Sequence, residues 1–74
     1  MNAPLPVVTP KQVIKALQHA GFVIDHQTGS HVYLRIEGRQ PVTVPYHNKD
    51  LKRGTLKSIL RQAELTVEEF IELL

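Results

Sequence analysis

The sequence predicts one α+β domain: a three-stranded antiparallel sheet with helices on one face, in the order α-β-β-β-α, plus a short C-terminal helix. Capping boxes at Thr9 and Thr66 mark two helix starts. Between them, apolar and polar residues alternate over residues 30–36 and 42–44, which is the period of half-buried strands. The chain has 74 residues and no cysteine, so it makes a small domain that disulfides cannot stabilise.

The N-terminal part predicts a tail followed by a helix. Residues 1–8 contain two prolines and no periodicity, so we expect a loose tail ahead of a single domain over residues 9–74. The first helix is expected over residues 10–20, because the run Thr9-Pro10-Lys11-Gln12 combines an N-cap, a proline at the first helical position and a capping glutamine. Gly21 supplies the C-terminal stop.

Three strands are expected next. Residues 22–25 (Phe-Val-Ile-Asp) form a short β-prone run that ends in a polar turn at residues 27–29. The second strand is expected over residues 30–36 and the third over residues 42–44, with a turn at residues 37–40 between them. An antiparallel sheet of this kind buries one face under helices and leaves the other face open.

Two helices complete the predicted domain. Helical spacing of apolar residues returns over residues 54–63, and the capping box at residues 66–69 opens a short helix with Phe70 on its apolar side. This two-layer arrangement resembles that of double-stranded-RNA-binding domains at the level of the fold.

The pairing of the second and third strands decides what the open face carries. Directly opposed residues share a face, so two registers keep Leu34 in the core with the valines of the third strand. The first register pairs Leu34 with Val44 and sets His31 opposite His47. The second register pairs Leu34 with Val42 and sets His31 opposite Pro45. In either register, these side chains are expected on the open face: His31, Tyr33, Arg35, Thr43 and His47.

The charges are unevenly placed although the net charge is only +2. Residues 49–61 hold five basic residues against one aspartate, and residues 64–74 hold four glutamates and no basic residue. The basic segment indicates polyanion binding, although a solvated helix face produces the same pattern. No apolar run is long enough to cross a bilayer and the N-terminus does not resemble a signal peptide, so we expect a cytoplasmic protein that binds no membrane.

His31 is the strongest candidate for chemistry among the four histidines. An imidazole exchanges a proton near neutral pH, and RNA cleavage by attack of the 2′-hydroxyl requires such a transfer. The reaction also requires positive charge at the phosphate, which Arg35, Lys52 or Lys57 could supply. The alternative for His31 is an ordinary surface histidine.

The other histidines give weaker indications. His19 lies near the end of the first helix and His26 lies in or beside a turn. Both are expected to have a structural role or no particular role. His31 and His47 lack nearby carboxylates at ligand spacing, so no metal site is predicted.

Several ordered blocks of the sequence resemble a known family. The blocks are residues 29–34 (GSHVYL), 42–47 (VTVPYH), 51–63 (LKRGTLKSILRQA) and 65–70 (LTVEEF). Together with the opening helix and Gly21-Phe22, they resemble the HicA (YcfA-like) mRNA interferase toxins of type II toxin–antitoxin systems, from about residue 10 to the end.

The resemblance implies a toxin that is an mRNA-cleaving endoribonuclease, uses no cofactor and is inhibited by a HicB-type antitoxin. The family's catalytic histidine matches His31. Many relatives carry a second histidine directly after it, where this chain has Val32. The second proton carrier therefore stays open between His47, a lysine and water. The residues expected to assist are His47, Tyr33 and Ser30. The residues expected to bind RNA are Gly29, Arg35, Lys52, Arg53, Lys57 and Arg61.

The main hypothesis is therefore a metal-independent ribonuclease with His31 as general acid or base. Two other functions fit the same residues. The domain could bind RNA without cleaving it, or its open face could serve only to dock a partner protein.

Overall fold

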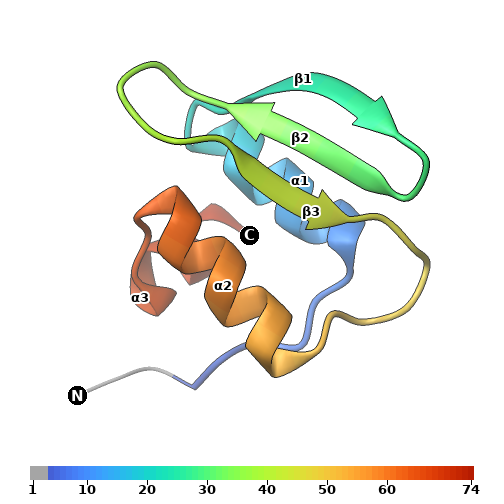
Figure 1. Ribbon diagram of the computed structural model, residues 1–74. Coiled ribbons are helices and arrows are strands. Elements are labelled where there is room, and N and C mark those ends of the chain that lie inside the picture. The colour runs from blue at the N-terminus through green and yellow to red at the C-terminus, as the bar shows by residue number, and fades with distance from the viewer. Residues whose placement is uncertain (1–3) are drawn as a thin grey trace.

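Helices pack on one face of a three-stranded antiparallel sheet in the computed structural model, which describes residues 4–74 (Figure 1). The strands lie in the order β1-β2-β3, so β2 is central. The elements are α1 (Pro10–His19), β1 (Val23–Thr28), β2 (His31–Arg35), β3 (Val42–Pro45), α2 (Arg53–Ala63) and α3 (Val67–Leu73). This confirms the predicted α+β architecture, which is that of double-stranded-RNA-binding domains.

Two of the three helices begin at the predicted capping boxes. The Gln12 amide donates to Thr9 Oγ1 at 3.3 Å, and the Thr9 amide donates to Gln12 Oε1 at 2.9 Å. Thr66 and Glu69 make the same reciprocal pair at 3.1 and 2.9 Å. Each pair satisfies two backbone amides that a helix start otherwise leaves without partners. The start of α2 differs, because its N-cap residue, Lys52, makes no side-chain capping bond.

The core lies between the sheet and the helices. β2 and β3 turn alternate residues toward it, and these are at most 2% exposed: Val32, Leu34, Val42 and Val44. Phe70 brings α3 into the same core with no exposed surface.

Of the two registers that the sequence allows, the structure adopts the one that pairs Leu34 with Val42 and His31 with Pro45. Ile36 consequently lies beyond the β2–β3 ladder. It is partly buried against the core, and its Cδ1 lies 3.1 Å from where a Cβ on Gly21 would stand. Ile36 thus packs at the end of α1 instead of pairing within the sheet.

The first strand is longer than predicted. The sequence indicated a strand ending at Asp25 and a turn at residues 27–29, but β1 continues to Thr28. A β-bulge between Ile24 and His26 inserts Asp25, and pairing then resumes up to the turn. All six residues of β1 are exposed, so the strand does not need alternating apolar and polar residues. The sequence pattern therefore did not predict the full length of the strand.

The prediction of a loose tail over residues 1–8 is wrong at its C-terminal end. Val8 is 3% exposed, and its carbonyl accepts a hydrogen bond from the Leu51 amide at 2.9 Å. This bond fixes the segment before α1 against the loop before α2. Residues 1–3 lie outside the described part of the chain.

Candidate active site on the open face of the sheet

The sheet face opposite the helices carries most of the residues that the sequence assigned to a site. The register places three rows of side chains on it: Thr28, His31 and Pro45; His26, Tyr33 and Thr43; and Val23 and Arg35. The predictions of His31, Tyr33, Arg35 and Thr43 on this face are confirmed. His26 is the addition that the sequence analysis did not make.

His31 stands at the start of β2, directly after a two-residue turn. Gly29 in this turn has φ +53°, a left-handed conformation that glycine adopts without strain. The turn pairs Thr28 with His31 on one side, and Pro45 of β3 lies opposite on the other. The His31 side chain is exposed, and its imidazole makes no hydrogen bond or ion pair with residues 4–74. Both of its ring nitrogens are therefore available to a ligand.

The backbone of Ser30 holds the segment that follows β3. The Tyr46 amide donates a hydrogen bond to the Ser30 carbonyl, so contact between the two chain segments continues one residue past β3. Ser30 thus helps to fix the turn that presents His31.

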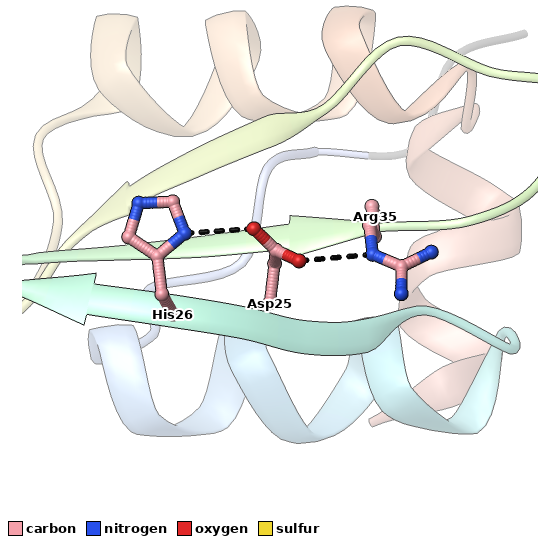
Figure 2. A network of polar contacts seen from close by, with 3 residues as sticks. All are labelled: Asp25, His26 and Arg35. Atoms are coloured by element: carbon pink, nitrogen blue, oxygen red, sulfur yellow. Dashed lines mark hydrogen bonds and ion pairs between the residues drawn. The ribbon is translucent and has the colours of Figure 1, made fainter.

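Asp25, His26 and Arg35 form a polar network on this face (Figure 2). His26 Nδ1 donates to Asp25 Oδ2 at 2.7 Å, and Arg35 Nε donates to Asp25 Oδ1 at 3.0 Å. These two hydrogen bonds, that of His26 foremost, lower the pKa of the Asp25 carboxyl. Asp25 is therefore ionised at neutral pH, and the bulge is what brings its carboxylate to these two partners.

The His26 ring also stacks on Tyr33. The ring centroids are 4.4 Å apart and the planes meet at 13°. The two residues are direct neighbours across β1 and β2. The sequence did contain a signal for this pairing, because Gly29-Ser30 is the kind of dipeptide that forms two-residue hairpin loops, and such a loop sets Tyr33 opposite His26.

His47 lies beyond the end of β3, in a hollow of about 340 Å³ at the start of α2. The Lys49 amide donates to His47 Nδ1 at 3.1 Å, so the neutral ring carries its proton on Nε2 and presents a donor there. Lys49, Lys52 and Pro45 also line the hollow. Since Pro45 is the residue opposite His31, it links the hollow to the open face.

The predicted set of phosphate-binding residues is divided between two surfaces. Arg53, Lys57 and Arg61 line a different groove, where α2 meets Leu5 and the start of α3 at Val67. This groove lies on the helical side of the molecule. These three side chains therefore lie on a different surface from the hollow that contains His47 and Lys52, and whether they bind RNA stays a prediction.

The remaining histidine, His19, joins two helices. His19 Nδ1 donates to the Leu73 carbonyl at 3.0 Å and so joins α1 to α3, which supports its predicted structural role. Within residues 4–74, no three His, Cys, Asp or Glu side chains gather as metal ligands would. None of the helices described has the length and hydropathy that a bilayer span requires.

A comparison with protein families identifies the family to which the chain is similar. The family described as "HicA toxin of bacterial toxin-antitoxin" matches residues 10–65, which run from the start of α1 to just before α3. No curated protein matches the chain.

Proposed function

This chain belongs to the HicA toxin family of bacterial toxin–antitoxin systems, and we propose that it is a cytoplasmic toxin that cleaves mRNA with His31 as general acid or base. The observation that carries this proposal is the position of His31. It is exposed and unpartnered among the described residues, at the mouth of a tight turn on the open face. A structural histidine of this domain, such as His19, is instead hydrogen-bonded between elements.

The chemistry needs little beyond these side chains. In RNA the 2′-hydroxyl can attack the adjacent phosphorus, so the nucleophile belongs to the substrate and no metal is needed to generate it. The protein must move protons and stabilise negative charge on the phosphoryl oxygens. His31 moves a proton, and Arg35 supplies charge from the same face while its Nε holds Asp25.

The geometry also supports a path for the RNA backbone. The path runs from the open face at His31 over Pro45 into the hollow that contains His47 and Lys52. The first backbone amides of α2 face this end without a side-chain cap, and such amides are favourable to phosphate. In this proposal His47 and Lys52 bind phosphate, and Gly29 allows the backbone to pass close to the turn.

A HicB-type antitoxin is the proposed inhibitor. All helices among the described residues lie on the other side of the sheet, so the face that holds His31 is left uncovered. A protein bound over it would exclude RNA from His31. We expect such an antitoxin to stop cleavage without altering the fold of the toxin.

The test is a comparison of His31→Ala with the matched variant His19→Gln, which removes an imidazole away from the face. We expect His31→Ala to bind a short RNA as the wild type does, yet to lose cleavage and growth arrest, while His19→Gln retains both. Cleavage should persist in a chelator. Wild-type cleavage by His31→Ala would contradict the proposal.

Two results with the wild-type protein would favour the other functions. RNA binding without any cleavage would indicate a binding module. Absence of RNA affinity even at low salt would indicate a docking protein, because phosphate contacts strengthen as salt is lowered.

A further inference from the structure

His26 and His31 are diagonal neighbours on one face of the sheet. The β1–β2 register pairs Thr28 with His31 and His26 with Tyr33, and side chains two residues apart along a strand point to the same side. Diagonal positions of an antiparallel pair are about 7–8 Å apart at the backbone. Two imidazoles at this separation can approach opposite sides of one phosphodiester.

The surroundings of His26 orient its ring. The Asp25 carboxylate holds Nδ1, and Arg35 holds Asp25 from the other side. Tyr33 stacks on the flat side of the ring. In Figure 2 the second ring nitrogen points away from the carboxylate, and it has no partner among residues 4–74. A carboxylate on one nitrogen and an exposed second nitrogen are the arrangement of an oriented proton carrier.

We propose that His26 is the second proton-transfer residue of the site and that Asp25 is its positioning residue. This inference rests on the proposed ribonuclease function. The 2′-oxygen forms a bond to phosphorus while the bond from phosphorus to the 5′-oxygen breaks. His31 takes the proton of the 2′-hydroxyl, and His26 Nε2 gives a proton to the departing 5′-oxygen. The products are a 2′,3′-cyclic phosphate and a 5′-hydroxyl end.

The assignment of the acid to His26 follows from the charges around it. The groups that face His26 are Asp25 and Tyr33, with Arg35 behind Asp25. The ionised Asp25 can keep its hydrogen bond to a protonated imidazole as an ion pair, whereas His31 has no carboxylate partner among the described residues. In-line displacement separates the entering and leaving oxygens, so two histidines on one face can serve one oxygen each.

The experiment uses single-turnover cleavage of a short RNA that the wild-type protein cuts at one site. A second substrate carries sulfur in place of the bridging 5′-oxygen, and it leaves as a thiolate without needing an acid. The variant is His26→Phe, which retains a ring to stack on Tyr33 but no nitrogen. We expect it to be slower by about 10²–10⁴-fold on the oxygen substrate and by less than about tenfold on the sulfur substrate.

Controls separate this inference from the proposed function. His31→Ala should be slow on both substrates, because sulfur does not replace the base. Gln27→Phe places the same ring on the next residue of β1, which points to the other face, and should cleave like the wild type. Thermal unfolding of each variant checks its fold.

Three outcomes would overturn the inference. One is a His26→Phe rate within a few-fold of wild type on the oxygen substrate while His31→Ala is inactive, which leaves the proposed function standing. Another is an equal loss on both substrates. The third concerns Asp25→Asn, which should slow cleavage of the oxygen substrate more than cleavage of the sulfur substrate, because the carboxylate orients the ring that gives the proton. An equal effect on both substrates would remove Asp25 from the proposal. Wild-type cleavage by His31→Ala would instead contradict the function itself.

Discussion

Replacement of Phe70 by alanine should lower the free energy of unfolding by about 3–5 kcal/mol. Phe70 has no exposed surface, and it is the buried residue through which α3 enters the core. Truncation leaves a cavity in addition to the lost burial of the ring. A domain of 74 residues has a total stability of about 4–11 kcal/mol, so the change removes a large part of it. The effect is notable because α3 lies outside residues 10–65, the part that matches the family.

Urea unfolding followed by far-ultraviolet circular dichroism measures this change. With a slope of about 1.5 kcal/mol per molar urea, the midpoint of Phe70→Ala should fall by about 2–3 M, or the variant should be unfolded without urea. Ile71→Ala is the matched control, because Ile71 follows in the same helix but is 39% exposed. If the two variants had the same midpoint, the reasoning that α3 is part of the core would be refuted.

Three further predictions concern the turn, the carboxylate and the phosphate contacts. Gly29→Ala should lower the free energy of unfolding by about 1 kcal/mol, measured by thermal unfolding. The cause is the φ of +53°, since no atom lies within 4 Å of an added Cβ. Gly29→Asn should cost less stability, and equal losses would contradict a conformational cause. Because the pKa of Asp25 is lowered by folding from its ordinary 3.8, its contribution to stability is complete above that pH and is lost as the pH falls through the folded-state pKa. The stability difference between wild type and Asp25→Asn should therefore shrink on acidification, and a difference independent of pH would contradict this. Lys52→Ala should reduce the slope of log affinity for single-stranded RNA against log salt by about 0.7. Lys57→Ala changes a residue in the groove on the helical side and should leave this slope unchanged. The reverse result would move the RNA path to α2.

The helix starts could be predicted because their signals are local. A capping box needs only residues three apart, so Thr9 and Thr66 identify their helices without knowledge of the rest of the fold. The alternation along β2 likewise assigns Val32 and Leu34 to the core and His31 to the open face.

The strand register could not be decided in the same way. Both even registers place the valines of β3 in the core, so periodicity is equally satisfied by each. In the register that the structure adopts, Ile36 lies outside the β2–β3 ladder and packs near Gly21 at the end of α1. That contact joins residues that no local pattern connects.

The residues of the candidate site also divide into those that a local pattern predicts and those that depend on the fold. His31 was predicted, and the structure places it where the prediction required. His26 was passed over because an exposed edge strand has no burial pattern, and a bulge further disturbs its alternation. The basic residues were predicted as one group because they are close in sequence. Helical geometry sends Lys57 to a different surface from Lys52.

The sequence by itself determined the order of the elements, the buried faces of the helices and of β2 and β3, and the histidine at the start of β2. These follow from periods of two and 3.6 residues and from caps, which act over a few residues of chain. Only the tertiary structure decided that Asp25, His26 and Arg35 form one network on the open face, and that Val8 is held by Leu51. Such contacts depend on which distant segments meet, and this is fixed by the packing of the whole domain.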